Sequence, residues 1–325
     1  MYNTDRLRLF NLPVFNDIED LASLCHISSE KLRAIFFRSS KFYRKVTIPK
    51  NSGGTRTIYQ PNKTVKAVQA WILRHILDKI SPSHHATAFR KNISIKNNIE
   101  PHKFNRYFFC VDLKDFFPSI DHRRIEILFQ RIGYSATQAV ILANLCTCQF
   151  LLPQGGVTSP AISNLVVSRL DTRLSGFCSK KHIIYTRYAD DMTFSSNNRN
   201  ILNNATSIIK SIIEDEKFEI NVEKVRFVGP GVNCKVTGLI KDSSEPKFGV
   251  GKKKKNWMRS VIFNLIVNKT VIDQKYKTLG SIMGWLSHVK FVDKSGFKYL
   301  NAYLSRLLKN SETLIGSCQK ASNEN

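Results

Sequence analysis

Apolar residues recur at helical spacing in the first third of the chain and predict a core-facing helix there. Residues three and four apart share one face of a helix, and this pattern ends near Ser81-Pro82. The apolar members are Val65, Val68, Trp71, Ile72, Ile76, Leu77 and Ile80. Residues 45–59 instead predict two short strands joined by the turn Asn51-Ser52-Gly53-Gly54.

The middle of the chain predicts helices on either side of a glycine-containing loop. The segment 106–117 contains an apolar run that ends at Asp112. It is followed by residues 119–149, which have a helical pattern, and by a loop at 153–159. Ser159 is expected to cap the next helix and Pro160 to occupy its first turn. One apolar stripe follows, made of Ile162, Leu165, Val166, Leu170 and Leu174.

Residues 183–195 predict a β-hairpin, because mainly apolar and β-branched flanks surround a tight turn at Ala189-Asp190. A helix over 202–213 and strands near 225–228 and 236–240 follow. Together these elements predict an α+β fold, with a small sheet backed by helices.

The chain becomes strongly basic from Lys241 onward, with 16 Lys and Arg against 6 Asp and Glu. Three further helices are expected in this basic lobe. Their apolar stripes are Met258/Val261/Ile262/Leu265, Leu279/Ile282/Met283/Leu286 and Leu300/Tyr303/Leu304/Leu307.

Composition favours a nucleic-acid partner. The 325 residues are 42% hydrophobic, enough for two or three lobes, and carry a formal net charge of +25. No uninterrupted apolar run approaches the roughly 18 residues of a membrane span, and residues 1–6 do not resemble a signal peptide. The expected partner is therefore a polyanion rather than a membrane, and the expected location is the cytoplasm.

The seven cysteines are scattered and lie mostly in apolar sequence, which favours reduced thiols. Cys146 and Cys148 are close in sequence, but no second Cys or His pair stands at a spacing suited to zinc. Core packing is the expected role of both.

Adjacent carboxylates at a hairpin tip are a candidate metal site. Asp190 and Asp191 occupy the tip, and Asp112 ends the apolar run upstream, so a sheet is needed to bring the three together. Carboxylate oxygens suit Mg²⁺, and two such ions can support phosphoryl transfer. The alternative is that Asp190-Asp191 is an ordinary solvated turn.

Four motifs in order resemble a bacterial retron-type reverse transcriptase. They are Asp112, Leu152-Pro153-Gln154-Gly155, Tyr188-Ala189-Asp190-Asp191 and Val236-Thr237-Gly238, and the likeness begins near Arg56. The resemblance implies a right-hand polymerase fold. Fingers would span 1–105, a palm 106–240 with finger-associated helices near 119–150, and a basic helical thumb 241–325.

The resemblance also implies roles for individual residues. Asp112, Asp190 and Asp191 would be catalytic and would hold two Mg²⁺ ions. Phe117 would exclude the ribose 2′-hydroxyl, although simple packing is its alternative. The implied nucleotide-binding residues are Arg56, Arg90, Asp115, Phe117, Gln154, Gly155 and Lys224.

RNA binding is implied for a second group of residues. Asn98 and His102 match the ends of a family Asn-Ala-x-x-His element, although Ile99 replaces its alanine. Four lysines followed by a tryptophan offer counterion release and a stacking surface. The implied RNA-binding residues are Asn98, His102, Val236, Thr237, Gly238, Lys252, Lys253, Lys254, Lys255 and Trp257.

The activity implied is RNA-directed DNA synthesis from dNTPs. The template would be part of a cognate structured non-coding RNA, primed from an internal guanosine 2′-hydroxyl, and the product a branched RNA–DNA hybrid used in anti-phage defence. An effector protein and a host RNase H would be partners. The alternatives are a group II intron-like reverse transcriptase, a metal-dependent nuclease, and a catalytically silent RNA-binding scaffold holding an effector.

Overall fold

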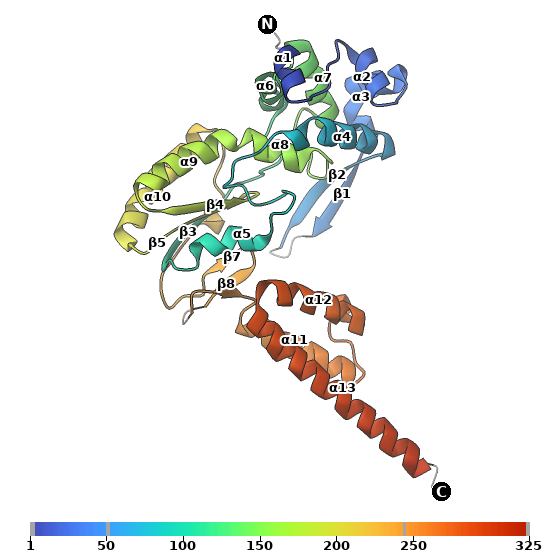
Figure 1. The fold of residues 1–325 in the computed structure, drawn as a ribbon, viewed down its shortest axis with the longest axis vertical. Coiled ribbons are helices and arrows are strands. Elements are labelled where there is room, and N and C mark those ends of the chain that lie inside the picture. Colours follow the sequence, from blue (N-terminus) through green and yellow to red (C-terminus); the bar gives the residue numbers. More distant parts are fainter. Residues whose placement is uncertain (1–3, 50–52, 243–244, 323–325) are drawn as a thin grey trace. The chain divides into compact units, whose positions relative to one another are not determined.

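The computed structural model describes residues 4–49, 53–242 and 245–322. The chain divides into two compact units, each shown as a ribbon in Figure 1. Residues 1–98 and 109–227 form the first unit, and residues 99–108 and 228–325 form the second.

The first unit begins with short helices and a longer buried one. In α4, the Asn62 side chain accepts a hydrogen bond from Val65 N (2.9 Å), while Val68 and Ile72 are buried. The predicted helix is confirmed, but it breaks at Ile76 before a single 3₁₀ turn. These elements are α1 (Thr4–Leu9), α2 (Ile18–Leu24), α3 (Ser29–Arg38), η1 (Ser39–Phe42), α4 (Lys63–His75) and η2 (Leu77–Lys79).

The predicted hairpin in the first third is confirmed. β1 (Tyr43–Pro49) and β2 (Thr55–Pro61) pair antiparallel, from Tyr43 opposite Pro61 to Pro49 opposite Thr55. Asn51 and Ser52 of the predicted turn lie outside the described residues.

The segment predicted as helical over 119–149 forms two helices, α6 (His122–Ile132) and α7 (Ala136–Cys146). Gly133 ends α6 with a left-handed φ of 135°, which glycine adopts at little cost, and Ser135 starts α7 with a capping box. The next stripe also divides, into α8 (Ser159–Val166) and α9 (Ser168–Lys180). The prediction of Ser159 as a cap is wrong, since Thr158 precedes the helix and Ser159 is its first residue.

A four-stranded sheet has the strand order β4-β5-β3-β6. Buried aromatic rings pack together on this sheet. The Phe194 ring lies 4.9 Å from that of Tyr185 and 5.9 Å from that of Phe109, measured between centroids. Helix α9 contacts β4, and α10 contacts both α9 and β5, so these helices back the sheet as predicted (Figure 1). The elements are β3 (Tyr107–Asp112), β4 (Ile184–Tyr188), β5 (Asp191–Ser196), α10 (Arg199–Asp215), η4 (Val222–Lys224) and β6 (Arg226–Val228).

The second unit contains a small antiparallel sheet, β7-β8-β9. The single strand predicted near 236–240 is wrong, because Thr237 (φ 44°) and Gly238 (φ 84°) turn the chain between two strands. The strands are β7 (Lys235–Val236), β8 (Leu239–Lys241) and β9 (Phe248–Gly249), and η3 (Glu100–His102) follows α5 (Ile95–Ile99).

The three helices predicted after Lys241 are confirmed. Their core includes Met258, Ile262, Leu286 and Leu300, all fully buried. Buried Asp293 joins α12 to α13, where it accepts hydrogen bonds from Val250 N (3.2 Å) and Gly296 N (2.8 Å). The elements are α11 (Lys252–Ile266), η5 (Gln274–Tyr276), α12 (Leu279–Val292) and α13 (Lys294–Ser322).

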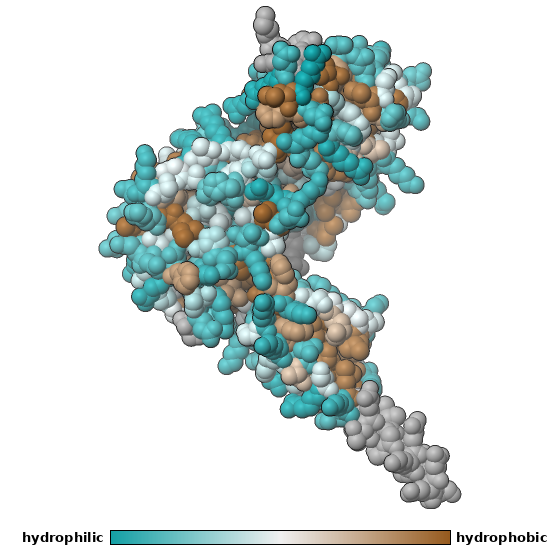
Figure 2. Space-filling model, in the orientation of Figure 1, coloured by the Kyte–Doolittle hydropathy of each residue, from teal (hydrophilic) through white to brown (hydrophobic). Residues whose placement is uncertain are grey.

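Surface and thiol properties follow the sequence pattern. Figure 2 shows hydrophilic residues over most of the face drawn for each unit. In the part of the chain that the structure describes, no helix combines the length and hydropathy needed to cross a bilayer. Cys146 and Cys148 are buried thiols outside any disulfide, as expected.

His102 makes stability depend on pH. Burial lowers the pKa of its imidazole to about 3, from about 6.5 in an unfolded chain. Between these values the unfolded chain binds a proton that the folded chain does not, so the free energy of unfolding falls as pH drops below about 6.5. We expect urea unfolding at pH 7 and pH 5 to show a smaller loss in His102→Gln than in the parent chain. Exposed His288 in the same unit provides a control, and equal losses in His102→Gln and His288→Gln would contradict the assignment.

Candidate catalytic site

The β4–β5 hairpin ends in a two-residue turn that carries the first candidate carboxylate. Tyr188 pairs with Asp191, which leaves Ala189 and Asp190 as the turn, as predicted. Ala189 has a left-handed φ of 58°, which an alanine adopts only when its surroundings hold it there. The carbonyl of Asp190 accepts a hydrogen bond from Leu113 N (3.1 Å), and this bond ties the end of β3 to the turn.

The three candidate carboxylates are electrostatically coupled. Burial and then the Asp112 charge raise the pKa of Asp190. Burial, followed by the charges of Asp190 and Asp112, raises the pKa of Asp191 to about 6. The strand end and the hairpin therefore concentrate negative charge that a cation would stabilise.

Two cationic side chains stand close to this charge. Lys224 Nζ lies 2.9 Å from both Oδ1 and Oδ2 of Asp112, and it lowers the pKa of Asp190 and Asp191. Arg56 on exposed β2 also lowers the pKa of Asp190. Asn221 donates its backbone N–H to the Asp112 carbonyl (2.9 Å), which positions Lys224 three residues later.

The donor set fits a divalent cation. Carboxylate oxygens are the ligands that Mg²⁺ and Ca²⁺ prefer, and the raised pKa values show that the carboxylates lack full compensation by protein cations. Among residues 4–49, 53–242 and 245–322, no three Asp, Glu, His or Cys side chains are already arranged around a common metal position. Because the Lys224 ammonium occupies both oxygens of Asp112, a cation there has to share or displace it.

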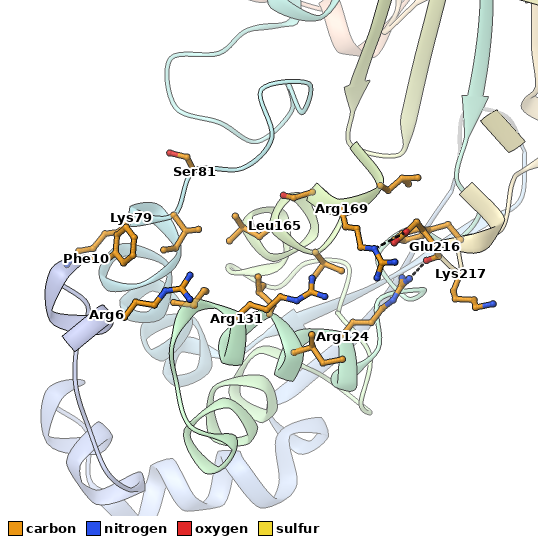
Figure 3. A pocket seen from close by; sticks show the side chains of 18 of the residues that line it. Arg6, Phe10, Lys79, Ser81, Arg124, Arg131, Leu165, Arg169, Glu216 and Lys217 are labelled. Carbon is orange, nitrogen blue, oxygen red and sulfur yellow. Dashed lines mark hydrogen bonds and ion pairs between the residues drawn. The ribbon is translucent and has the colours of Figure 1, made fainter. Parts of the chain in front are cut away.

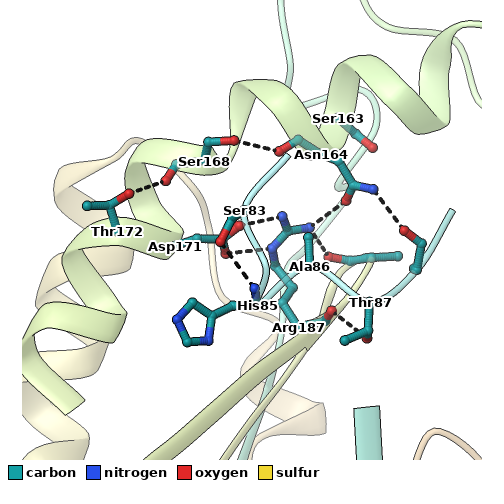
Figure 4. A network of polar contacts seen from close by, with 12 residues as sticks. Ser83, His85, Ala86, Thr87, Ser163, Asn164, Ser168, Asp171, Thr172 and Arg187 are labelled. Carbon is teal, nitrogen blue, oxygen red and sulfur yellow. Dashed lines mark hydrogen bonds and ion pairs between the residues drawn. The ribbon is translucent and has the colours of Figure 1, made fainter. Parts of the chain in front are cut away.

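A buried ion pair between Arg187 and Asp171 supports the Ala189-Asp190 turn (Figure 4). Arg187 on β4 is fully buried and donates from Nε and Nη2 to the two oxygens of Asp171 on α9, at 2.8 and 2.7 Å. Its Nη1 donates to the Ala189 carbonyl (3.0 Å) and to Asn164 Oδ1 (3.2 Å). The guanidinium thus connects the strained residue of the turn to two helices.

The same network reaches the segment after His85. The Asn164 amide donates to the Ala88 carbonyl (2.8 Å), and Thr87 N donates to the Arg187 carbonyl (2.8 Å). Tyr185 donates its hydroxyl to Asp171 Oδ1 (2.8 Å). Every oxygen of the buried Asp171 carboxylate is therefore hydrogen-bonded, which compensates the cost of burying the charge.

Gln154 and Gly155 lie against the strand that carries Arg56. Tyr59 N donates to the Gln154 carbonyl (2.9 Å). Gly155 has φ 123°, and a Cβ there would lie 2.8 Å from the Tyr59 carbonyl oxygen, so only glycine allows this approach.

The remaining predicted nucleotide-binding residues have mixed surroundings. The Phe117 ring is half-buried and contacts Phe116 (5.4 Å) and Phe89 (6.2 Å). Asp115 is exposed with a left-handed φ of 45°. Arg90 donates to the carbonyls of Ser83 and Ala86 (both 3.1 Å), so its guanidinium supports its own loop.

The predicted RNA-binding residues do not share one environment. Asn98 and His102 are 1% and 0% exposed, and Asn98 Oδ1 accepts from Thr87 Oγ1 (2.9 Å). Burial favours a structural role for both over direct contact with RNA. Val236 is buried as well, and Thr237-Gly238 form the β7–β8 turn.

The lysine run opens α11 in the second unit. Lys252, Lys253 and Lys254 are exposed, while Lys255 is half-buried and lies 3.9 Å from Asp293. Trp257 is 37% exposed, and its ring packs edge-on against Tyr276 (5.5 Å). Part of its surface therefore stays available for stacking.

The sequence prediction missed Arg187, Asp171, Asn164 and Asn221. Arg187 alone left a signal, since it is a charged residue inside an otherwise apolar strand next to the turn. Such a residue is buried only when paired.

Comparisons with known proteins identify the family of the chain. Residues 48–283 match the family model described as reverse transcriptase (RNA-dependent DNA polymerase). The chain is 37% identical to the retron Ec86 reverse transcriptase of Escherichia coli, over 94% of each chain. It is 32% identical to the retron Mx65 reverse transcriptase of Myxococcus xanthus, over 79% of this chain and 65% of that relative.

A solved structure shares the fold. Telomerase from Candida albicans superposes with a TM-score of 0.50 at 12% identity, over 83% of this chain and 59% of the telomerase chain. The mixed helices and small antiparallel sheets described above are those of a right-hand polymerase. The chain belongs to the retron-type reverse transcriptases, a family of RNA-directed DNA polymerases that use divalent metal ions, an RNA template and dNTPs.

Proposed function

We propose that this polymerase copies part of its own structured non-coding RNA. Synthesis starts from an internal guanosine 2′-hydroxyl and leaves a branched RNA–DNA hybrid. The proposal is supported by relatives that are retron reverse transcriptases over nearly the whole chain. The observation that carries the catalytic part is the electrostatic interaction of Asp112, at the end of β3, with Asp190 and Asp191 at the β4–β5 turn.

Asp112, Asp190 and Asp191 are proposed to hold two Mg²⁺ ions. When bound, such ions stabilise the attacking and leaving oxygens in phosphoryl transfer. Arg56 and Lys224 add positive charge beside the carboxylates, where they would favour binding of a triphosphate. Lys224 balances part of the Asp112 charge through its contacts with both carboxylate oxygens, and it would have to release an oxygen for Asp112 to hold a cation.

Phe117, Gln154 and Gly155 are proposed to shape the nucleotide pocket. The Phe117 ring packs edge-to-face with Phe116, with centroids 5.4 Å apart, and this contact would hold it beside the sugar of an incoming nucleotide. The absent side chain at Gly155 lets the loop lie against β2 and expose backbone to the base pair. Asp115 and Arg90 would act nearby, Arg90 through the loop it supports.

RNA recognition is proposed for the second unit. Lys252, Lys253 and Lys254 with the exposed part of Trp257 form a surface suited to phosphates and a stacked base. In this proposal residues 1–105, 106–240 and 241–325 act as fingers, palm and thumb. Asn98, His102 and Val236 would support this function from buried positions.

Wider roles follow from the family. The hybrid would remain bound in the bacterial cytoplasm, a host RNase H would trim the template, and the complex would restrain an effector in anti-phage defence. Unchanged phage sensitivity after deletion of the neighbouring RNA gene would remove the defence role. The rivals are an RNA-binding scaffold without activity and a group II intron-like enzyme.

The first test is the nucleic acid that the purified protein carries. Protein from its native host should yield one discrete DNA that shortens with RNase A on a denaturing gel. Asp190→Asn should carry no DNA. Changing a residue that supports a metal ligand lowers activity by up to about 100-fold, and changing the ligand itself should lower it further. Glu214→Gln, an exposed carboxylate on α10, serves as control. RNA alone in every sample would favour the scaffold.

Phe117→Ala should relax sugar discrimination. Opening the space next to the sugar removes the steric penalty on a 2′-hydroxyl, so the preference for dNTP over rNTP in kcat/KM should fall roughly 10–100-fold. Steady-state primer extension with both substrates measures it. Phe37→Ala changes an aromatic residue that is 75% exposed on α3 and should leave the ratio intact. A preserved ratio in Phe117→Ala would contradict the gate.

Two sets of substitutions at Arg187 should separate its effect on the free energy of unfolding from its effect on the geometry of the Ala189-Asp190 turn. Arg187→Met leaves the Asp171 charge buried and unpaired, and we expect it to lower the free energy of unfolding by about 3–5 kcal/mol. In Asp171→Leu/Tyr185→Phe/Arg187→Met no charge or phenol of the network stays unpartnered, so much of that stability should return.

The triple variant still lacks the donor to the Ala189 carbonyl, so its kcat for primer extension should remain low while KM for dNTP changes little. Denaturant unfolding and steady-state kinetics on the same preparations make the comparison. If kcat recovers together with stability, the network has only a structural role.

A further inference from the structure

The first unit contains a basic pocket that shares no residue with the predicted polymerase site. Its cavity of about 680 Å³ lies among α1, the end of η2, α6, the start of α9 and the residues after α10 (Figure 3). Six basic residues line it, namely Arg6, Lys79, Arg124, Arg131, Arg169 and Lys217.

The two carboxylates in the pocket wall are already neutralised. Asp215 pairs with Arg173 (2.8 Å), and Glu216 pairs with Arg173 (2.8 Å) and Arg169 (3.2 Å). Arg131 is exposed and has no carboxylate within ion-pair distance among residues 4–49, 53–242 and 245–322. The pocket therefore has a surplus of positive charge.

The Arg124 guanidinium is held in place and has one donor without a partner, so it is suited to bind an anion. Its Nη2 donates to the Glu216 carbonyl, and its guanidinium carbon lies 4.3 Å from the centroid of the Phe218 ring. Its Nη1 is buried and has no hydrogen-bond partner within the described part of the chain. Burial lowers the pKa of this guanidinium, and the charges of Asp121 and Glu216 only partly oppose that effect. A buried donor on a fixed fork is a ready contact for a phosphate oxygen.

An aromatic ring lies at the other end of the cavity. Phe10 follows α1 and is 46% exposed, and Figure 3 shows it beside Lys79, apart from Arg124. Apolar side chains such as Leu165 and Ile132 form part of the wall between them. Base stacking on an aromatic ring next to basic residues is the usual design for single-stranded nucleic acid.

We propose that this pocket binds a short segment of single-stranded nucleic acid, with phosphates on Arg124 and Arg131 and a base on Phe10. The cavity has the volume of a small-ligand pocket, which is enough for one or two nucleotides. A double helix is too wide to enter it. An acidic protein segment would satisfy the arginines but leave the Phe10 ring and the apolar wall without a partner. The RNA partner and the DNA product share the recognised chemistry, and the test separates them.

Photocrosslinking of the full-length protein tests the site directly. The probes are an oligouridylate with 4-thiouridine and an oligo-dT with 4-thiothymidine, and a saturating template–primer duplex occupies the polymerase site. Mass spectrometry should find a nucleotide attached to Phe10. A crosslink with one probe identifies RNA or DNA as the source, and crosslinks with both indicate recognition of the shared backbone. Asp190→Asn should keep the crosslink, so failure of catalysis and failure of this site can be distinguished.

Arg131→Glu should reduce the Phe10 crosslink severalfold and lower the salt dependence of binding by about one phosphate contact, a slope change of about 0.7. Lys180→Glu makes the same charge change at an exposed position about 16 Å further along α9 from Arg169, and should have no effect. Arg124→Gln should also lose the crosslink, because it removes the buried Nη1 donor. It removes the Nη2 bond to the Glu216 carbonyl as well, so its thermal stability is measured on the same preparation. The proposal would be overturned if neither probe crosslinked to Phe10. It would also be overturned if oligoglutamate blocked the crosslink and unlabelled oligonucleotides did not, or if Arg131→Glu and Lys180→Glu crosslinked equally.

Discussion

The ion pair between Arg187 and Asp171 is the constraint on which the candidate site depends. Both side chains are fully buried, and a buried charge is tolerated only when every donor and acceptor is matched. Two guanidinium nitrogens satisfy Asp171, and the third reaches Asn164 and the Ala189 carbonyl. The pair therefore sets the position of α9 against β4 and the conformation of the turn at the same time.

The positions of the carboxylates, and so their ability to bind a cation, depend on this ion pair. Ala189 stays in a left-handed conformation because its carbonyl is held, and Asp190 then lies where Leu113 binds its backbone. Asp112 ends the neighbouring strand, so three negative charges meet without enough protein cations to balance them. Lys224 compensates Asp112 in part, and the rest of the charge favours a divalent cation.

The sequence predicted the elements with strong periodicity and the ends of the central strands. Helices α4 and α10 to α12, the β4–β5 hairpin and Asp112 at the end of β3 follow from apolar spacing and turn chemistry. It did not predict the division of 236–240 into two strands, because the left-handed φ of Thr237 depends on tertiary contacts rather than on local propensity. The burial of Asn98 and His102 was missed for a related reason, since polar residues in a short helical segment usually face solvent. Arg187, Asp171 and Asn164 lie on three different elements, β4, α9 and α8, and only the fold shows that they form one network.

The proposed catalysis requires a divalent-cation site formed by Asp112, Asp190 and Asp191, and Mn²⁺ binding followed by electron paramagnetic resonance tests this site most directly. The measurement is a titration of the nucleic-acid-free protein and of Asp190→Asn, with Glu214→Gln as control. We expect saturable Mn²⁺ binding in the parent chain and the control, and its loss in Asp190→Asn, because Asp190 lies within the coupled carboxylate cluster. Equal Mn²⁺ binding in Asp190→Asn and the parent chain would contradict the account.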